Sequence, residues 1–161
     1  MAKQVVRQPK PMASTRHHMI PKSRCRSKPD QKSNIKKVPR KIHEAWHTLF
    51  GNLTPFEVVE CIVRYFPQKD SFIYLKMVIE LQGVRQTFKL TEPKTFCDSI
   101  PHLAKFNMRA WNIVFSRRRT VFDAVILVIE SWAPKGYFKE VEIRYHHPDG
   151  GEATYEYPVQ S

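Results

Sequence analysis

A chain of 161 residues, of which 42% are hydrophobic and 12% aromatic, can bury a core as one domain or as two very small ones, so we expect the bulk of it to fold. The net charge of +12 lies at one end, because residues 1–42 hold 13 Lys or Arg and a single acid, Asp30, whereas the remaining residues hold 14 bases and 14 acids. A basic segment of this kind attracts polyanions, and the three cysteines, none of them in a CxxC pair, argue against a disulfide framework and a cysteine-ligated zinc site.

The first elements in chain order are a basic arm and a short hairpin. Residues 1–14 contain proline and lack periodicity, so we expect them to be disordered. Residues 16–21, RHHMIP, are predicted to end a strand, and the polar, basic stretch 23–33 is predicted to be a loop. Residues 34–38, NIKKV, alternate well enough for a second short strand.

Two amphipathic helices are predicted next. Pro39 suits the first position of a helix through residues 41–50, and Gly51 suits its end. Residues 54–57, TPFE, form a capping box with proline at the first helical position. They predict a second helix that continues over residues 58–66.

Most of the remaining chain is predicted to form strands. Residues 72–81 and 84–90, separated by a Gln-Gly turn, have a strand-like pattern, although the first of these segments could also be helical. Residues 141–145 and 153–157 flank the turn sequence PDGG at 148–151, which predicts a β-hairpin.

Four histidines and an asparagine have the spacing H-H-x15-N-x8-H-x3-H: His17, His18, Asn34, His43 and His47. His43 and His47 lie four residues apart in the predicted helix, so their imidazoles project from one face. His17, on the preceding hairpin, can complete a site of three nitrogens with an open position for water or a phosphate oxygen. This arrangement is typical of a catalytic rather than a structural metal site.

This spacing resembles that of the HNH, or ββα-metal (His-Me finger), nucleases, and especially the histidine-rich version found in the nuclease domains of colicins. The resemblance covers residues 15–50 and includes the order of strand, basic loop, short strand opening at the asparagine, and helix with the last histidines. Two features depart from the family, since the loop lacks the paired glycines common before its asparagine and the unit has no cysteine staple. Neither departure removes a proposed catalytic group.

The resemblance implies a divalent-metal-dependent endonuclease that hydrolyses phosphodiester bonds of nucleic acids, with DNA favoured over RNA and no membrane partner. His17, His43 and His47 would hold the ion, for which Mg²⁺, Zn²⁺, Ni²⁺ and Mn²⁺ are candidates. His18 would be the general base that activates water. Asn34 would tie the loop to the histidine strand through side-chain hydrogen bonds and so fix the orientation of the imidazole.

Several basic side chains of the same segment are candidate phosphate contacts, although each could instead be a solvated surface residue. They are Arg16, Lys22, Arg24, Arg26, Lys36, Lys37 and Arg40.

Two other interpretations remain open. A nuclease fold that has lost catalysis and still binds metal and nucleic acid, for instance on DNA or a ribosome, would keep the same residues. Residues 43–47 also match H-E-x-x-H, the zinc-protease signature, in which Glu44 would be the base. That short pattern often occurs by chance, and it leaves His17, His18 and Asn34 unexplained, so the nuclease interpretation is preferred.

The expected fold class is α+β. A disordered arm over residues 1–14 precedes an HNH-like ββα-metal module with its following helix, residues 15–66, and a C-terminal α+β region with a helix and a β-hairpin, residues 67–161. The cysteine pattern, the lack of an apolar leader and the lack of a long apolar run favour a cytoplasmic protein.

An internal similarity suggests a degenerate duplication, although two helical hairpins with similar caps could also arise from packing needs alone. Ala45-Trp46, Phe50, Thr54 and Phe56-Glu57 match Ala110-Trp111, Phe115, Thr120 and Phe122-Asp123. Met108 and Asn112 stand where the first copy has His43 and His47, so a second copy would be scaffold rather than a metal site.

Overall fold

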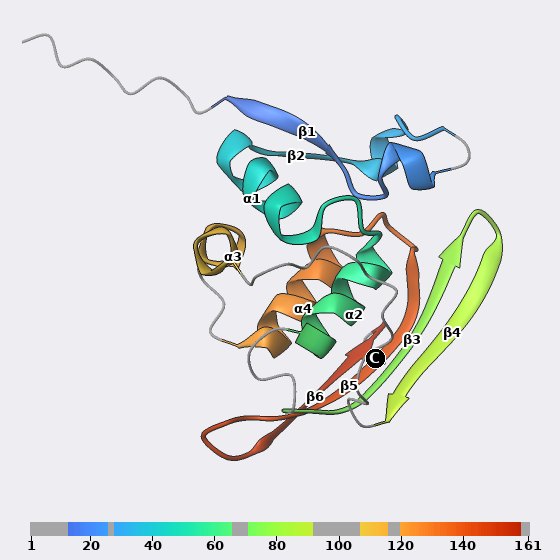
Figure 1. Cartoon of the computed structure of the whole chain (residues 1–161). Coiled ribbons are helices and arrows are strands. Elements are labelled where there is room, and N and C mark those ends of the chain that lie inside the picture. The colour runs from blue at the N-terminus through green and yellow to red at the C-terminus, as the bar shows by residue number, and fades with distance from the viewer. Residues whose placement is uncertain (1–12, 26–27, 66–70, 92–106, 116–119, 159–161) are drawn as a thin grey trace, which may run out of the picture.

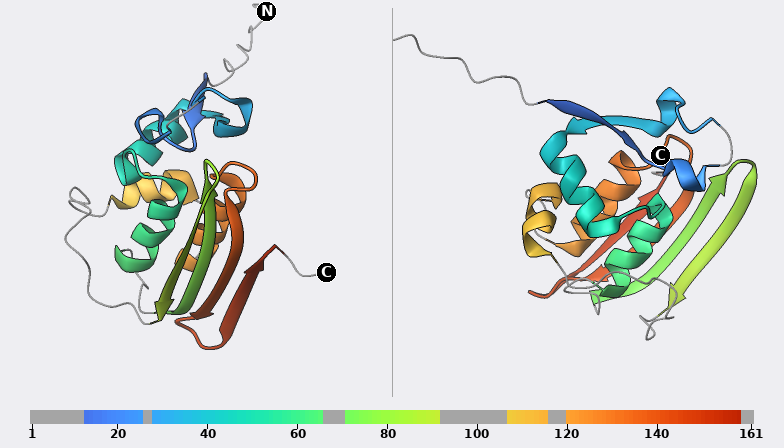
Figure 2. Two further views of the ribbon diagram at one scale, coloured as in Figure 1. Left: turned by 90° about the vertical axis from the view of Figure 1, so that its right-hand side faces the viewer. Right: turned by 45° about the horizontal axis from the view of Figure 1, so that its top comes forward.

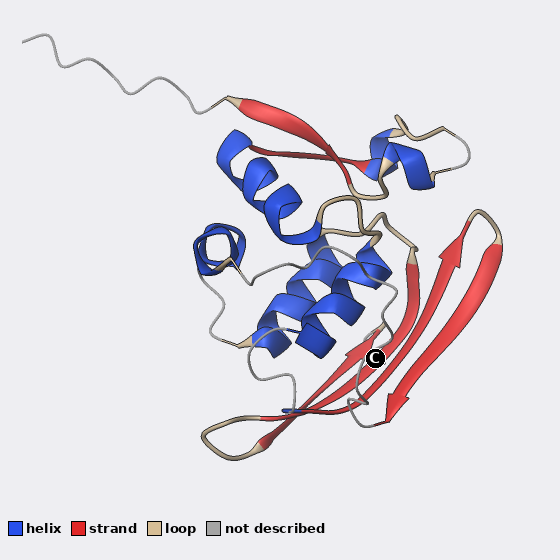
Figure 3. Ribbon diagram, viewed as in Figure 1, coloured by secondary structure: helices blue, strands red, loops and turns tan. Residues whose placement is uncertain are grey.

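The structure, a computed structural model of the whole chain, describes residues 13–25, 28–65, 71–91, 107–115 and 120–158. These residues form four α-helices, a two-stranded β-hairpin and a four-stranded antiparallel sheet (Figure 1 and Figure 3). The predicted α+β class is therefore confirmed. Within the described part of the chain, the longest helices are too short for a membrane span.

The N-terminal unit is a hairpin followed by a helix. Strand β1 (Ser14–His18) pairs antiparallel with β2 (Ile35–Pro39), and α1 (Arg40–Phe50) follows directly. Between the strands lie two 3₁₀ turns, Lys22–Arg24 and Lys32–Asn34. The residues of the expected arm before residue 13, and Arg26 in the loop, fall outside the described residues.

Several boundaries of this unit differ from the prediction. Strand β1 begins at Ser14, inside the expected arm, because Ser14 pairs with Pro39 of β2, and it ends at His18 rather than at residue 21. Asn34 ends a 3₁₀ turn rather than opening the second strand, because its buried side chain bonds to the loop backbone. Pro39 ends β2 instead of starting the helix, since its ψ of 141° is extended and the helix begins one residue later. The helix ends before Gly51 as predicted, and Gly51 has φ 54° and ψ −122°, a conformation that favours glycine.

Two further helices begin with side-chain caps. Helix α2 (Pro55–Tyr65) follows a capping box in which the backbone N–H of Glu57 donates to Thr54 Oγ1 at 3.4 Å and the N–H of Thr54 donates to Glu57 Oε2 at 2.8 Å. Helix α4 (Val121–Ser131) follows Thr120, whose Oγ1 accepts the N–H of Asp123 at 3.2 Å. The predicted start of α2 is confirmed, whereas residue 66, its predicted end, is not described.

The sheet contains β3 (Phe72–Leu81), β4 (Val84–Thr91), β5 (Phe138–His146) and β6 (Glu152–Tyr157), in the order β4-β3-β5-β6. Both hairpins predicted for this part of the chain form. Residues 72–81, which could also have been helical, are therefore a strand. The pairing of β3 with β5, which joins the two hairpins into one sheet, was not predicted.

The order of elements repeats along the chain. Helices α1 and α2 precede the β3–β4 hairpin, and α3 (Met108–Phe115) and α4 precede the β5–β6 hairpin. Equivalent elements also pack on each other, since α1 contacts α3, α2 contacts α4 and β3 pairs with β5. This arrangement supports an internal duplication.

Helices α2 and α4 lie against one face of the sheet, and the β1–β2 hairpin and α1 lie at one end of the helical layer (Figure 2). One hydrophobic core includes residues from the first and the second half of the chain. Its connection to the N-terminal unit includes Trp46 of α1, which stacks on Trp132 after α4 with ring centroids 3.9 Å apart. The β1–β2 hairpin and α1 therefore pack against the rest of the molecule through the shared hydrophobic core.

Candidate metal centre

Three imidazoles from β1 and α1 meet at one point. One ring nitrogen each of His17, His43 and His47 lies within 4.8 Å of the others, so the group could hold a metal ion. His43 and His47 face the same way because they are one helical turn apart, and their Nε2 atoms are 3.0 Å from each other. The His17 ring lies 5.3 and 5.4 Å from the two helical rings, centroid to centroid.

Each of the two helical imidazoles has a hydrogen-bond partner at Nδ1. Thr15 Oγ1 lies 3.0 Å from Nδ1 of His43 and 3.3 Å from the carbonyl oxygen of Val38, to which its hydroxyl can donate. His47 Nδ1 lies 2.9 Å from the carbonyl oxygen of Gly51, which can only accept. Without an ion, the 3.0 Å contact between the two Nε2 atoms is a hydrogen bond, so one of them carries a proton. With an ion bound, both rings would carry their proton on Nδ1 and offer both Nε2 lone pairs to the ion.

A shared cation would replace the hydrogen bond between the two Nε2 atoms. Nitrogens bound tetrahedrally to one ion at about 2.0–2.1 Å would lie about 3.3 Å apart. The 3.0 Å between the Nε2 atoms of His43 and His47 is close to that separation. A small outward movement of either ring would therefore admit an ion.

His17 supplies the third nitrogen from a buried position. Its side chain is 2% exposed, and neither ring nitrogen has a hydrogen-bond partner among the described residues. Burial, together with the neighbouring His47 and His43, lowers its pKa from 6.5 to about 3, so the imidazole stays neutral. A buried polar group without a partner is costly, and a metal ion would satisfy one of the two ring nitrogens. The three residues thus fit a metal.

The same imidazoles line an open cavity of about 340 Å³. Its wall also contains His18, the expected base, and Arg16, Lys22 and Trp46. The three imidazoles and His18 therefore border one cavity.

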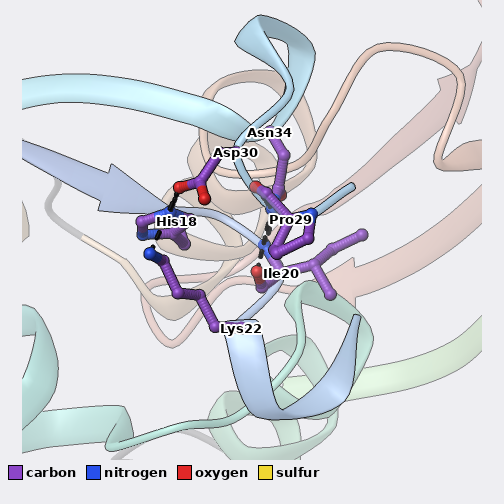
Figure 4. Close-up of polar contacts among 6 residues, drawn as sticks. All are labelled: His18, Ile20, Lys22, Pro29, Asp30 and Asn34. Atoms are coloured by element: carbon purple, nitrogen blue, oxygen red, sulfur yellow. Dashed lines mark hydrogen bonds and ion pairs between the residues drawn. The ribbon is translucent and has the colours of Figure 1, made fainter. Parts of the chain in front are cut away.

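His18 belongs to a small polar cluster at the end of β1 (Figure 4). Its Nε2 lies 2.9 Å from Oδ1 of Asp30, and Nζ of Lys22 lies 3.2 Å from the same oxygen. The side chain of His18 is 20% exposed and that of Asp30 is 59% exposed. His18 is therefore held by a partner and is still open to solvent.

Asn34 joins the loop to the strand that carries the histidines (Figure 4). Its Oδ1 accepts the N–H of Ile20 at 2.7 Å, and its Nδ2 donates to the carbonyls of Ile20 at 2.9 Å and Pro29 at 3.0 Å. These bonds are the tie that the resemblance implies. Asn34 therefore contacts the backbone at Ile20, two residues after His18, and at Pro29, directly before Asp30, and it does not contact the His18 imidazole in these bonds. An effect of Asn34 on the orientation of that imidazole would act through the loop backbone.

Three of the candidate phosphate contacts are exposed close to His18. Arg16 and Lys37 are directly opposite each other in the β1–β2 pairing, so their side chains share the outer face of the hairpin. His18 is two residues from Arg16 and lies on that face as well. Arg16 and Lys22 also line the cavity.

Three other candidates among the described residues, Arg24, Arg40 and Lys36, contact groups of the protein itself, as Lys22 does through its ion pair with Asp30 at 3.2 Å. Arg24 forms an ion pair with Glu57, and Arg40 pairs with Glu44 at 2.8 Å. Nζ of Lys36 lies 5.3 Å from the ring centre of Trp132, and burial lowers the pKa of this lysine. Lys36 is thus part of the packing around His17 rather than an exposed phosphate contact.

Four contributors to this site were not identified from the sequence. Asp30 had a signal, because it is the single acid of a basic segment. Thr15 also had one, since it lies two residues before His17 on the same strand face. The Gly51 carbonyl and Trp132 had none, because one is a backbone atom and the other comes from a distant part of the chain.

Comparison of this chain with protein-family models, with curated proteins and with solved structures found no match. The likeness of residues 15–50 to HNH nucleases therefore stays a prediction from the motif. Any functional proposal depends on the geometry of the three imidazoles and their surroundings.

Proposed function

We propose that this protein is a divalent-metal-dependent endonuclease that hydrolyses phosphodiester bonds of nucleic acids. The observation that carries the proposal is the meeting of His17, His43 and His47 in a cavity that also exposes His18. Such an arrangement suits metal-assisted hydrolysis. The three imidazoles would hold the ion, and His18 would accept a proton from the attacking water.

The donor set favours some metals over others. Three neutral imidazoles suit Zn²⁺ and Ni²⁺, whereas Mg²⁺ and Mn²⁺ prefer carboxylate and carbonyl oxygens. The group of His17, His43 and His47 includes no carboxylate. We therefore propose Zn²⁺ or Ni²⁺ as the ion held by the protein. When bound, it would stabilise negative charge on the phosphate and on the leaving oxygen.

His18 would take part in the reaction as the base. The oxygen of a water molecule attacks phosphorus while His18 accepts one proton from that water. The bond from phosphorus to the leaving oxygen breaks, the leaving oxygen gains a proton from solvent, and His18 later returns its proton to solvent. Arg16 and Lys37 would hold neighbouring phosphates by charge on the outer face of the hairpin.

The geometry gives little support to a zinc protease. In that mechanism Glu44 would activate water at the ion, but its carboxylate pairs with Arg40 and is 64% exposed. The third imidazole of the group, His17, comes from upstream of the helix, whereas the protease pattern needs a downstream ligand.

The test is nicking of supercoiled plasmid DNA by the purified full chain with added Zn²⁺, Ni²⁺, Mn²⁺ or Mg²⁺. Replacement His18→Ala should lower the cleavage rate by about 10²–10⁴, the usual cost of losing a general base, and should leave metal binding intact. His146→Ala, at an exposed position of β5, is the matched control and should cleave as the wild type does.

Each alternative function gives its own pattern. Absence of cleavage by the wild-type chain with every metal, while metal and DNA still bind, would replace the nuclease with a nucleic-acid-binding protein. Loss of peptide hydrolysis in Glu44→Ala, with His18→Ala unaffected, would instead establish the protease.

A further inference from the structure

One acidic side chain faces the proposed base. Asp30 is the only acid among residues 1–42, which hold 13 Lys or Arg, and its Oδ1 is 2.9 Å from Nε2 of His18. The negative charge of this carboxylate weakens the attraction of a basic segment for phosphate. Its position beside the His18 imidazole therefore indicates a role toward that imidazole.

We propose that Asp30 is a positioning residue that accepts Nε2–H of His18 and so keeps Nδ1 of this imidazole unprotonated and able to accept a proton. This inference rests on the proposed function, in which His18 is the base. Asp30 acts through His18 and needs no contact with the substrate.

The surroundings of Asp30 keep it a pure acceptor. The hydrogen bonds from His18 and Lys22 lower the pKa of its carboxyl group, so it is ionised at neutral pH. An ionised carboxylate has no proton to donate, and the hydrogen in the contact must therefore belong to Nε2 of His18. In a neutral imidazole this leaves the lone pair on Nδ1.

The loop holds Asp30 in place from both sides. Pro29, the residue before it, is bound through its carbonyl to Nδ2 of Asn34 at 3.0 Å, and Gln31, the residue after it, accepts the N–H of Asn34 at 2.9 Å. Asn34 thus connects the buried end of β1 to the loop segment that carries Asp30, which gives this asparagine a route to the base (Figure 4).

The first arm of the test needs no catalysis. Proton–nitrogen NMR correlations of the imidazole rings in the full chain, at mildly alkaline pH, report which nitrogen of His18 carries the proton. We expect Nε2–H in the wild type and in Asp149→Asn, a control at an exposed aspartate of the β5–β6 turn. Asp30→Asn should change the signal, because an amide can donate to Nε2 and favour the opposite tautomer.

The second arm measures plasmid cleavage. Asp30→Asn should lower kcat by about 10–100-fold and leave KM and metal affinity nearly unchanged, because the residue touches neither substrate nor ion. In a chain that already carries His18→Ala, Asp30→Asn should not lower the cleavage activity further, because both substitutions impair the same function, that of the base. A purely structural role would instead lower the activity of both backgrounds equally.

The two arms separate the two proposals. A wild-type His18 with its proton on Nδ1, or an unchanged His18 signal in Asp30→Asn, would overturn the role of Asp30 whether or not the chain cleaves DNA. Full cleavage activity of Asp30→Asn, together with an inactive His18→Ala, would overturn the role of Asp30 and leave the nuclease proposal standing. An inactive wild type with the expected NMR result would overturn the nuclease and keep the positioning contact.

Discussion

Thr15 and Gly51 determine how the two helical imidazoles can act. With an ion bound, each would accept an Nδ1–H, Thr15 from His43 and the Gly51 carbonyl from His47, and so leave an Nε2 lone pair for the ion. Such supporting hydrogen bonds orient metal ligands and raise their basicity. The metal affinity of this site should therefore depend on residues that never touch the ion.

Replacement Thr15→Val tests this dependence. Valine keeps the shape of threonine and removes the oxygen that accepts from His43, so we expect affinity for Zn²⁺ to fall by about 10–100-fold. Competition titration with a chelator measures the loss. Thr48→Val is the matched control on α1, because its hydroxyl donates to the carbonyl of Glu44 and faces solvent. Equal affinities of the two variants would contradict the role of Thr15.

Among the elements, those with strong local signals were predicted well. The capping box before α2 and the glycine after α1 are short-range features, and both helices begin or end where these signals place them. The spacing of His43 and His47 on one helix is equally local, so the sequence brought them to the same face. The sequence pattern also predicted the hairpin that carries His17, whereas the packing of this hairpin beside the helix was implied by the resemblance.

The long-range contacts of the elements could not be predicted. The pairing of β3 with β5 joins segments separated by about half the chain, and either hairpin could have paired through its other edge. Trp132 stacks on Trp46 and lies 5.1 Å from His17, again across a large separation in sequence. The boundaries at Asn34 and Pro39 were off by one residue because neither the side-chain hydrogen bonds of Asn34 nor the extended ψ of Pro39 can be read from the strand pattern.

For the molecule as a whole, the order of two helices and a β-hairpin occurs twice along the chain. The first half carries the histidines, whereas Met108 and Asn112 replace them in the second. The second half contributes Trp132 to the packing around His17 and pairs its strand β5 with β3. The candidate metal centre is thus packed against a part of the chain that has the same order of elements and no histidines at the matching positions.

Burial of His17 should make the metal-free fold sensitive to acid. Its pKa is about 3 in the folded chain against 6.5 for an exposed histidine, so the unfolded chain binds more protons between these values. The free energy of unfolding should therefore fall as the pH drops below about 6.5, by on the order of 2 kcal/mol at pH 5, and continue to fall toward about pH 3.

Urea unfolding at several pH values, with a chelator present, measures this effect. His17→Gln removes the titrating ring, so its stability should change less between neutral pH and pH 5 than that of the wild type, whatever its stability at neutral pH. The same loss on acidification in both chains would show that His17 is not the source.

The most direct test of the account is the number of metal ions bound per chain. Elemental analysis after saturation with Zn²⁺ or Ni²⁺ and removal of excess metal should give one ion for the wild type and for His146→Ala. His47→Ala should give none, and because His47 is exposed its loss leaves no cavity in the core. A wild-type chain without bound metal, or a His47→Ala chain that binds as tightly as the wild type, would contradict a metal centre at His17, His43 and His47.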